Sequence, residues 1–498
     1  MHASTERYQD WKAPSEDGAV LVWPAAKQFH NETIENQRRF NEKDGVRVGG
    51  VALKELRRRM RAWLGHNEPE QAIIATGHQA ELYHPGVWIK NVVIDSASRQ
   101  THAEAIHFAI DSDEPKHWNL RWPGENEPIT DDPNLAMAGW SALVAAPTPE
   151  HLQQLQQKAR EIPAKWGYEP KLFPLLESMQ KLVLAERSLP GMLVDATHEL
   201  DWSMGLKYQV LLASPIWSAE PYLLFVHHLL SRAGEFAGQY NSALHEYREQ
   251  EGIKAPGRPM PDLKVNDQGV ETPFWIDDLA KGTRQRAWLT RRGDELLLGG
   301  EFSFHGNGWD SAQKLGMWLR HHGLRISPRA LTLTMFLRMC VTDQWVHGIG
   351  GGRYDQVLDR LIERHFGMEA PRFAVATATL YFPGAIGRQR VCLPCIRQEG
   401  HRLRHAILGA EKMKLVEEID ALPRYSPQRG VVFQEMHRRL SDATHANPIL
   451  HQWETRAKES EARAAEEEVL FDRELFYAIQ PANRLEALIE RVRHTVGT

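Results

Sequence analysis

Cysteine is scarce in this chain. Its 498 residues include only three, Cys340, Cys392 and Cys395. An odd and sparse set argues against a secreted fold held by many disulfides and favours a reducing compartment. No run of about 18 apolar residues occurs, which argues against a transmembrane helix, and the first residues, MHASTERYQDWKAPSEDG, lack the apolar core of a signal peptide. We therefore expect a cytoplasmic protein with no membrane partner.

An excess of charge of one sign is also lacking. The formal net charge is -5, with 25% charged and 42% hydrophobic residues, a balance that argues against a dedicated nucleic-acid binder. The chain has no G-x-S-x-G elbow, no Walker lysine loop and no H-E-x-x-H helix, so the corresponding classes of catalysis are not indicated. The length suits roughly two to four domains.

The clearest structural pattern is a βαβ unit near the start of the chain. An apolar strand is predicted at 72–76, a helix at about 86–100 and a second strand at 103–113. Two apolar strands separated by one helix imply parallel pairing with a right-handed crossover. The fold class predicted is α/β, with a Rossmann-like parallel-sheet core.

Composition divides the rest of the chain into insertions and core segments. A helix-rich segment comes first. It is followed by a predicted β-meander bounded by turn residues, and then by a charged C-terminal stretch that is interrupted by prolines. We expect a Rossmann-like core in 1–122, 201–255 and 306–385, a helical insertion in 123–200, a β-meander insertion in 256–305, and a helical coiled-coil hairpin in 386–498. Near-heptad spacing in the last segment suggests a homodimer.

The loop after the first strand is the first candidate site. It contains Thr76-Gly77-His78-Gln79 and His84-Pro85-Gly86. In open parallel sheets, ligands bind outside the carboxyl ends of the strands, where the next helix presents unpaired N–H groups. His78 and His84 could donate there to an anionic group. The alternative is that they only cap the helix and line a turn.

The second strand ends in two acids, Asp111 and Asp113. Parallel pairing would bring them to the same sheet edge as His78, where carboxylates can orient an amine, a ribose or Mg²⁺. The alternative is a solvated acidic turn.

A glycine-rich segment, Gly350-Gly351-Gly352-Arg353-Tyr354, is the third candidate. We expect Ser327 to cap a helix that has Pro328 in its first turn, and a second helix to begin at Tyr354. Between them, Arg338 and Asp343 lie among apolar residues, and buried polar groups need partners that sites supply.

The pattern C-x2-C-x5-H-x3-H, formed by Cys392, Cys395, His401 and His405, leaves three readings open. The ligand types suit zinc, but the middle spacing is shorter than in a usual finger. A redox C-x-x-C pair and incidental cysteines are the other readings. We expect no metal at the main site.

Three of these segments resemble the bacillithiol-biosynthesis cysteine-adding enzymes (BshC-like proteins). The first family segment reads like TGQQxGLxxGPxYxxxK, which ATGHQAELYHPGVWIKN resembles at Thr76, Gly77, Gln79, Leu82, Gly86 and Lys90. DSDEPKH is similar to the acidic stretch that ends the family's second strand. ISPRALTLTMFLRMCVTDQWVHGIGGGRYDQVLDRL is similar to a later segment at Ser327, Pro328, Arg338, Asp343, Gly350, Gly351 and Tyr354.

The chain departs from that family pattern in three places. His78 stands for a glutamine, His84-Pro85 for a pair of small residues, and Gly352-Arg353 for a Pro-Gly-Glu turn. The resemblance implies a ligase that joins the carboxylate of cysteine to the amine of a glucosaminyl malate. The departures allow another amine or acid.

The leading hypothesis is a carbon–nitrogen ligase acting on small molecules. Its expected catalytic residues are His78, His84, Asp111 and Asp113. The expected binding residues are Thr76, Gly77, Gln79, Gly86, Lys90, Arg338, Asp343, Gly350, Gly351, Arg353 and Tyr354. No cofactor is identified, and ATP or ADP is the open candidate. A nucleotidyltransferase-like enzyme of another pathway and a noncatalytic coiled-coil scaffold are the alternatives.

Overall fold

The computed structural model describes residues 11–42, 45–68, 70–183, 185, 188–255, 257–445 and 447–497, without the side chains of 42, 405, 465 and 466. The chain forms two compact units. The first contains Met1–Arg121, Asn126–Leu380 and Arg473–Thr498, and the second contains Trp122–Glu125 and Tyr381–Asp472. The second unit is thus inserted into the sequence of the first.

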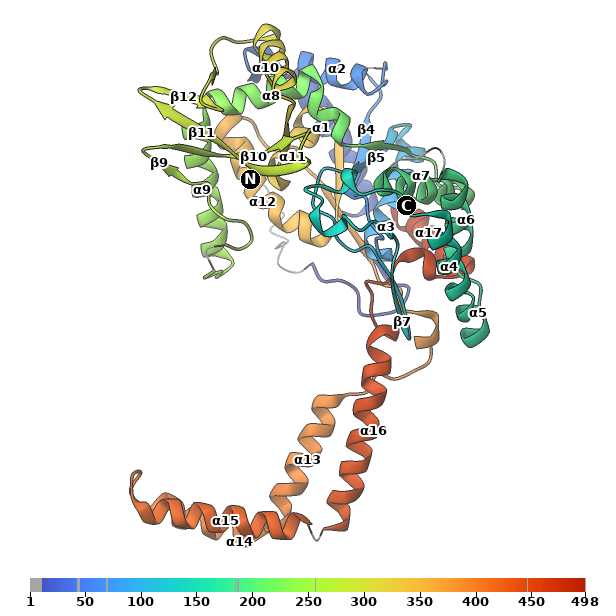
Figure 1. Ribbon diagram of the computed structural model, residues 1–498, viewed down its shortest axis with the longest axis vertical. Helices are drawn as coiled ribbons and strands as arrows, with labels where there is room; N and C mark the ends of the chain where they lie inside the picture. Colours follow the sequence, from blue (N-terminus) through green and yellow to red (C-terminus); the bar gives the residue numbers. More distant parts are fainter. Residues whose placement is uncertain are drawn as a thin grey trace. The chain divides into compact units, whose positions relative to one another are not determined.

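The centre of the first unit is a six-stranded sheet (Figure 1). Its spatial order is β1 (Val20–Trp23), β16 (Ala374–Ala378), β15 (Gln344–His347), β4 (Ile73–Gln79), β5 (Glu104–Ile110) and β8 (Gln209–Leu212). Only β1 among these strands is antiparallel to its neighbour; the other pairs are parallel. The protein therefore has a mixed α/β fold with a parallel-containing central sheet, as the sequence predicts.

The connection between strands reverses direction inside this sheet. Counted along the chain, β4, β5, β8, β15 and β16 are the first to fifth parallel strands, so their spatial order is 3-2-1-4-5. The chain moves outward from β4 on one side, then returns and moves outward from β15 on the other. The carboxyl ends of β4 and β15 are therefore flanked by connections that diverge, which leaves a crevice between them.

The first βαβ unit is present, with one change at its loop. Strand β4 pairs with β5 from Ile73 to Gln79, so Gly77, His78 and Gln79 are strand residues instead of the predicted loop. The extension arises because the edge of β5 offers backbone partners as far as Ile110. Helix α3 (Pro85–Thr101) begins after His84, whose side chain caps it.

Helices of the first unit pack around the sheet (Figure 1). Helix α17 lies against α3, α12 against α9, and α10 against α8. Each of these pairs joins helices that are distant in the sequence. The bounds are α1 (Ala26–Glu42), α2 (Leu53–Trp63), α4 (Pro149–Ala159), α5 (Glu161–Trp166), α6 (Leu172–Leu182), α7 (Leu189–Ser203), α8 (Glu220–Ser231), α9 (Ala233–Gln250), α10 (Trp309–His321), α11 (Ala330–Cys340), α12 (Ile349–Phe366) and α17 (Ala482–Gly497).

A second, antiparallel sheet belongs to the same unit. It is ordered β13 (Phe302–Ser303), β12 (Glu295–Leu298), β11 (Thr283–Arg292), β10 (Gly269–Asp278) and β14 (Leu324–Pro328), and β9 (Val265–Asn266) also pairs with β10. This is the meander of the sequence analysis, extended by β14. Two short hairpins, β2 (Arg47–Val48) with β3 (Val51–Ala52) and β6 (Asn119–Trp122) with β7 (Glu125–Pro128), complete the strands that the structure describes.

Two predicted helix starts were wrong. Ser327 and Pro328 lie in β14, and the N-cap of α11 is Arg329. The Ser327 hydroxyl donates to Asp277 on the neighbouring strand at 2.9 Å, so it does not cap a helix. Helix α12 begins at Ile349 instead of Tyr354. The glycines of the expected loop therefore form the first helical turn.

The second unit is helical. It contains α13 (Leu393–Ile407), α14 (Gly409–Ala421), α15 (Pro427–His445) and α16 (Pro448–Leu470). Helices α13 and α16 lie side by side, as do α14 and α15 (Figure 1). The expected helical region of 386–498 also covers α17, which belongs to the first unit.

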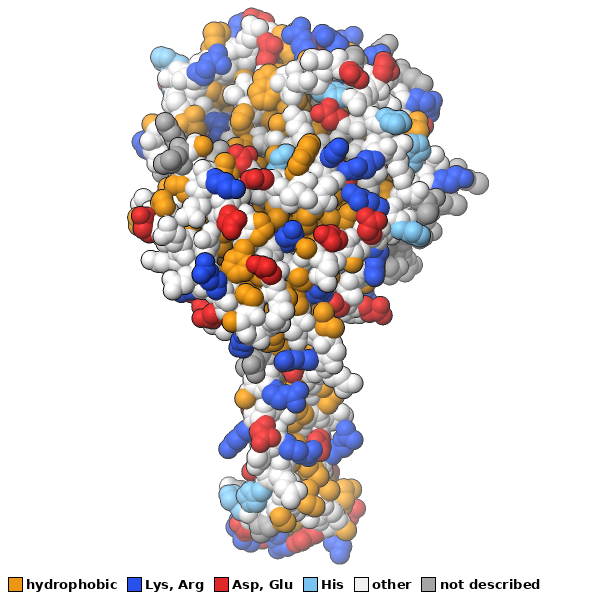
Figure 2. Space-filling model, turned by 90° about the vertical axis from the view of Figure 1, so that its right-hand side faces the viewer, with side chains coloured by type: hydrophobic (Ala, Val, Ile, Leu, Met, Phe, Trp, Pro, Cys, Tyr) orange, Lys and Arg blue, Asp and Glu red, His pale blue; other side chains and the backbone are white. Residues whose placement is uncertain are grey.

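The surface shows no separation of charge on the face that Figure 2 presents: acidic and basic side chains are interspersed over it. Among the described residues, no helix combines the length and apolar character that crossing a bilayer requires.

A buried ionic cluster fixes the amino-terminal end of β4. Asp343 Oδ1 accepts from Arg57 Nη2 at 2.6 Å, and Asp343 Oδ2 accepts from Arg61 Nη2 at 2.7 Å and from the backbone N–H of Ile73 at 2.9 Å. All three ionic side chains are at most 7% exposed. Because Asp343 directly precedes β15, the cluster joins helix α2 to both central strands.

Asp343→Asn should destabilise the protein strongly. It removes the charge that compensates two buried guanidinium groups, and breaking such a pair costs about 3–5 kcal/mol. Urea unfolding should show a lower midpoint than the wild type. The matched control is Asp310→Asn, which breaks an exposed pair with Lys314 and should change the free energy of unfolding by less than about 1 kcal/mol. Equal midpoints for the two variants would contradict this role.

Candidate functional site

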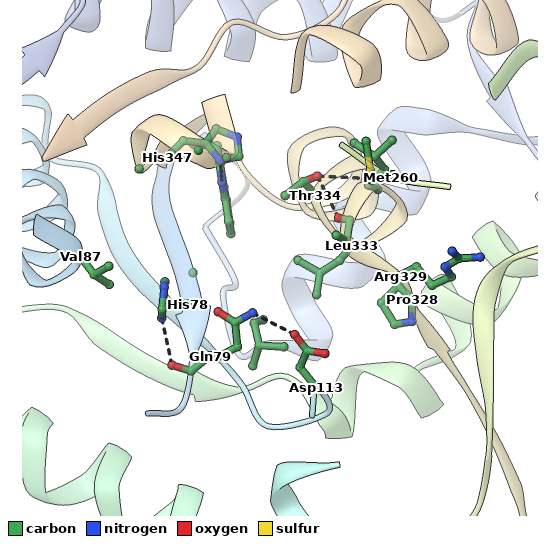
Figure 3. Close-up of a pocket in the computed structure, with 18 of the residues that line it drawn as sticks. His78, Gln79, Val87, Asp113, Met260, Pro328, Arg329, Leu333, Thr334 and His347 are labelled. Atoms are coloured by element: carbon green, nitrogen blue, oxygen red, sulfur yellow. Dashed lines mark hydrogen bonds between the residues drawn. The ribbon is translucent and has the colours of Figure 1, made fainter. Parts of the chain in front are cut away.

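A cavity of about 680 Å³ opens at the carboxyl ends of β4 and β15. Its floor includes the ends of both strands, so it lies at the point where the strand order reverses. Figure 3 shows that His78 and Gln79, from β4, and His347, from β15, face the same space as residues of β14 and α11. Of the residues predicted from the sequence, the cavity brings together Gly77, His78, Gln79, His84, Gly86, Lys90, Asp113, Gly350 and Gly351.

The N-termini of α3, α11 and α12 all reach this cavity. Gly86 and Val87 line it from α3, Ala330 and Leu331 from α11, and the segment 348–351 from α12. The first turn of a helix carries N–H groups without intrahelical partners and a partial positive charge. Several such ends directed at one space make a favourable environment for an anion.

Glycine is required where α3 and α12 approach the cavity. A Cβ on Gly86 would lie 2.6 Å from Arg473 Nη2 and 2.8 Å from the carbonyl oxygen of Ala378. A Cβ on Gly351 would lie 2.7 Å from His347 Nδ1. These contacts are too short for a side chain. The glycines therefore let the first turns of α3 and α12 pack closely against their neighbours at the cavity.

His84 caps α3 and lines the cavity at the same time. Its Nδ1 accepts from the backbone N–H of Gly86 at 3.0 Å. Burial, together with the nearby charge of Arg473, lowers the pKa of His84 to about 4. The ring is therefore neutral at physiological pH, with its remaining proton on Nε2. The capping role that the sequence left as an alternative is present, and Nε2–H is still able to donate.

His78 is also held as a neutral ring. Burial lowers its pKa well below the usual value, and the nearby charge of Lys90 acts in the same direction. Its Nδ1 lies 3.3 Å from the carbonyl oxygen of Gln79 and 3.4 Å from Glu81 Oε1. Because a carbonyl oxygen only accepts, Nδ1 carries the proton. Nε2 is then the basic atom of the ring.

Lys90 and Glu81 are ionisable groups in unusual states beside His78. Lys90 Nζ donates to the carbonyl oxygen of Gly77 at 2.8 Å. Burial lowers the pKa of Lys90 to about 7, against the attraction of Glu81. Burial raises the pKa of Glu81 to about 8, and Lys116 partly offsets it. Glu81 Oε2 has no hydrogen-bond partner within the part of the chain that the structure describes. The net charge of the two groups therefore changes near neutral pH.

Asp113 is the carboxylate that lines this cavity from the β5 side. Gln79 Nε2 donates to Asp113 Oδ2 at 2.9 Å, as Figure 3 shows. The backbone N–H of Glu114 donates to the other oxygen at 2.9 Å. Asp113 is half-buried, so it is oriented by its neighbours and still open to the cavity.

A buried relay supports the opposite wall. Asp355 Oδ2 accepts from His347 Nε2 at 2.7 Å and from Arg338 Nη1 at 2.6 Å. His347 Nδ1 accepts in turn from Trp345 Nε1 at 3.2 Å. Burial lowers the pKa of His347, although Asp355 opposes this effect. Arg338, expected to bind ligand, acts one layer behind the cavity by fixing Asp355.

Five other expected site residues lie outside the cavity lining. The Thr76 hydroxyl donates to Val346, Asp111 accepts from Ser214, and Asp343 belongs to the ionic cluster at the opposite end of β4. Arg353 donates to the carbonyl oxygen of Trp11, and Tyr354 is 44% exposed. Their contacts hold strands and helices together. Arg353 and Tyr354 lie away from the cavity because α12 begins earlier than predicted.

The predicted cysteine–histidine set is not assembled as a metal site. Cys392 and Cys395 are bonded to each other as a disulfide, so their sulfurs are not thiolate ligands in this form. His401 is exposed, and the side chain of His405 lies outside the described residues. The described part of the chain holds no group of three or more His, Cys, Asp or Glu residues suited to a metal ion.

Three residues with site contacts were missed by the sequence analysis. Arg329 lines the cavity and donates to Glu271 at 2.8 Å. Arg473 lines it and donates to Thr377 Oγ1 at 3.0 Å. Glu81 is the third. An acid in the first segment could have been noticed, but nothing near Arg473 in the sequence indicates a site.

No protein-family model matches this chain, and no curated protein matches it.

Anion binding to the cavity should weaken as the pH rises through neutrality. Below about pH 7 Lys90 is charged and Glu81 is neutral, whereas above about pH 8 Lys90 is neutral and Glu81 is charged. Sulfate is the probe, because its own charge is constant in this range. Calorimetry should show about a tenfold loss of sulfate affinity, or about 1.4 kcal/mol, when Lys90 loses its proton, and a second loss of the same size when Glu81 loses its proton.

Single variants separate these two steps. Lys90→Met should lose sulfate affinity at low pH, and Glu81→Gln should retain that affinity and lack the upper step. Lys314→Met, on exposed α10, is the control for a general charge effect. A wild-type affinity that is constant from about pH 6 to about pH 9 would rule out this arrangement of charges.

Proposed function

We propose that this protein is a carbon–nitrogen ligase that joins the carboxylate of an amino acid to an amine, in a Rossmann-like core. The 3-2-1-4-5 strand order supports the Rossmann-like assignment, because it is the order of the first five strands of that fold. The cavity at the reversal point occupies the place where such folds bind their ligands. The resemblance to BshC-like proteins supplies the reaction class.

The observation that carries the proposal is the distribution of charge around the cavity. The N-termini of α3, α11 and α12 and the side chains of Arg329 and Arg473 favour anions, whereas Asp113 provides a separate negative group. A ligase of this class must hold a carboxylate and an amine together. The cavity offers a region for each.

Within this proposal, Asp113 holds the amine as its ammonium form, with its carboxylate oriented by Gln79. Loss of a proton makes the amine nucleophilic, and the Asp113 carboxylate that holds the ammonium is the group that accepts that proton. The N–H groups in the first turns of α11 and α12 and the ammonium of Lys90 stabilise the carboxylate and the negative charge that develops on its oxygen. Positioning by these fixed groups supplies most of the rate enhancement.

Formation of an amide from a free carboxylate requires an activating group, and a bound nucleoside triphosphate would supply it. The chain's residues fit such a nucleotide: open space lies where a side chain at Gly350 would stand, which leaves the backbone of α12 uncovered there, and Arg329 and Arg473 line the same cavity. The same fit supports the alternative, a nucleotide-binding transferase of another pathway.

The second unit supports a homodimer through a helical coiled-coil hairpin. Met413 on α14, Val431 and Phe433 on α15, and Tyr425 between these helices are between 50% and 95% exposed. A second copy of the same helices would cover them. The hypothesis of a noncatalytic scaffold is supported by this exposed apolar surface alone. It does not explain the charged cavity of the first unit.

Asp113→Asn should remove ligase activity with little change in stability. The assay is mass spectrometry of the amide formed from cysteine and glucosaminyl malate with ATP. Loss of the ammonium partner should lower kcat/KM by about 100-fold or more, equivalent to about 2.7 kcal/mol. The melting temperature should stay close to that of the wild type, because the hydrogen bonds from Gln79 and Glu114 to the Asp113 carboxylate are part-buried and exposed, respectively.

The matched control is Glu114→Gln, an exposed neighbour, which should keep wild-type activity.

Thermal shift with ATP, ADP, cysteine and the amine separates the hypotheses. Stabilisation by nucleotides alone, without amide formation, would favour the transferase. No response to any ligand would favour the scaffold, and full activity of Asp113→Asn would refute its assigned role.

A further inference from the structure

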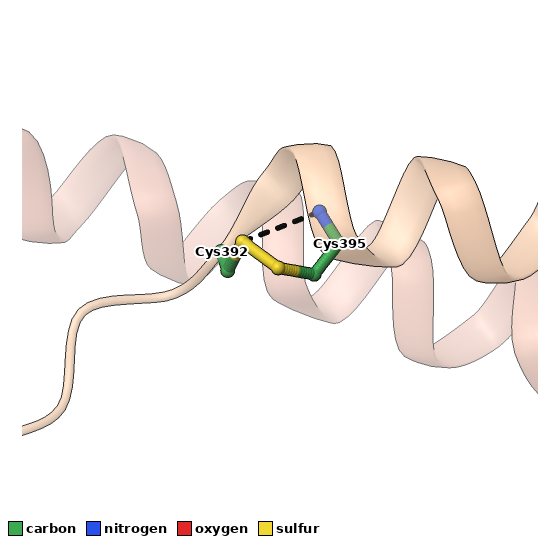
Figure 4. Close-up of a disulfide and its surroundings, with 2 residues drawn as sticks. All are labelled: Cys392 and Cys395. Carbon is green, nitrogen blue, oxygen red and sulfur yellow. Dashed lines mark hydrogen bonds between the residues drawn. A yellow bond between two sulfur atoms is a disulfide. The ribbon is translucent and has the colours of Figure 1, made fainter.

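The disulfide of the second unit lies at the first turn of helix α13. Cys392 is the N-cap residue, and Cys395 lies in the first turn (Figure 4). Both side chains are exposed. The sulfur pair is therefore accessible to reagents in solution, in contrast to Cys340, which is fully buried in α11.

The helix start favours a negative charge on one of the two sulfurs. Cys392 Sγ accepts a hydrogen bond from the backbone N–H of Cys395 at 3.2 Å, which Figure 4 marks. A thiolate at this position would gain that bond and the partial positive charge of a 15-residue helix. Exposed Arg390 and Arg397 stand two residues before and after the pair. This is the environment in which cysteine thiols become reactive at neutral pH.

A groove of about 480 Å³ lies next to the pair and belongs to the same unit. Arg390, Leu393 and Pro394 line it on the disulfide side, and Glu461, Glu467 and Glu468 of α16 line the other. Glu467 is fixed by the backbone N–H of Val391 at 2.9 Å. The groove has room for a small molecule that carries both a positive and a negative group.

The disulfide contributes little to holding α13 in place. It joins residues only three positions apart, and closing so short a loop restricts the unfolded chain less than closing a long one. Other contacts fix the helix against α16: Trp453 Nε1 donates to the carbonyl oxygen of Ile396 at 3.1 Å, and Arg456 pairs with Glu399 at 2.9 Å. A purely structural role therefore does not account for the pair.

We propose that Cys392 and Cys395 form a redox-active dithiol–disulfide pair that exchanges electrons with a low-molecular-weight thiol bound in this groove. The thiolate of the small molecule attacks Cys392 Sγ, the Sγ–Sγ bond breaks, and Cys395 leaves as a thiolate. A second small thiol attacks the sulfur of the first and releases Cys392. The small molecule leaves as its disulfide, and the two electrons and two protons remain on the cysteine pair. This site does not depend on the proposed ligase function.

The test is a redox titration of the full chain in glutathione buffers that range from fully oxidised to fully reduced. Free thiols are counted by alkylation and mass spectrometry. Cys392 and Cys395 should become reduced together and reoxidise reversibly in the folded protein. In the Cys395→Ser variant, Cys392 should accumulate as a mixed disulfide with glutathione. In the Cys392→Ser variant, Cys395 should form at least about tenfold less of this mixed disulfide, because Cys392 is the sulfur at the N-cap.

Cys340→Ala is the control and should leave the titration unchanged. Circular dichroism of the Cys392→Ser, Cys395→Ser double variant checks the structural alternative, and its melting temperature should stay close to that of the wild type. The proposal is overturned if the pair exchanges only after the protein has been unfolded. It is equally overturned if the double variant loses its helical unit, because the disulfide would then be a structural link.

Discussion

The arrangement of the first unit depends on one buried carboxylate, Asp343. It accepts hydrogen bonds from two guanidinium groups of α2 and from the first backbone N–H of β4, and it directly precedes β15. The cluster therefore sets where both central strands begin. Since Gln344 pairs with Ile74 and Val346 with Thr76, the starting points of the strands also determine where their carboxyl ends, and the cavity, are found.

The two ends of β4 have opposite electrostatic requirements. At its beginning, a negative group is buried and fully compensated by arginines. At its end, helix N-termini, Lys90 and arginine side chains surround an open space, and among the described residues Asp113 is the carboxylate that lines it. The first arrangement is closed and stabilises the fold. The second faces an open cavity, and helix N-termini directed at a cavity are what an anionic ligand requires.

The sequence predicted the parts of this unit that depend on local patterns. The run Ile73-Ile74-Ala75, the amphipathic segment after Pro85 and the acids after β5 indicated a parallel unit with polar ends, and His78, Gln79, His84 and Asp113 do line one cavity. The bounds of β4 were not predictable, because they depend on pairing with β5, about 30 residues away along the chain.

Other differences have the same non-local origin. Ser327 is a plausible helix cap by sequence, yet Asp277 on a neighbouring strand binds its hydroxyl. Asp343 and Arg338 were recognised as buried polar residues that need partners, but sequence does not distinguish a partner in the fold from a ligand. Arg473 reaches the cavity from a segment that is separated from β16 by Tyr381–Asp472, the long part of the second unit.

That separation affects how the protein is made. The ribosome delivers the sheet and most of the cavity wall first, then helices α13 to α16 of the second unit, and only afterwards the segment with Arg473 and α17. Until then α3 lacks the helix that packs against it, and a nascent chain has an exposed apolar face there. Synthesis that stops within the inserted helices would leave a sheet without its last cover, which makes such products candidates for chaperone binding and proteolysis.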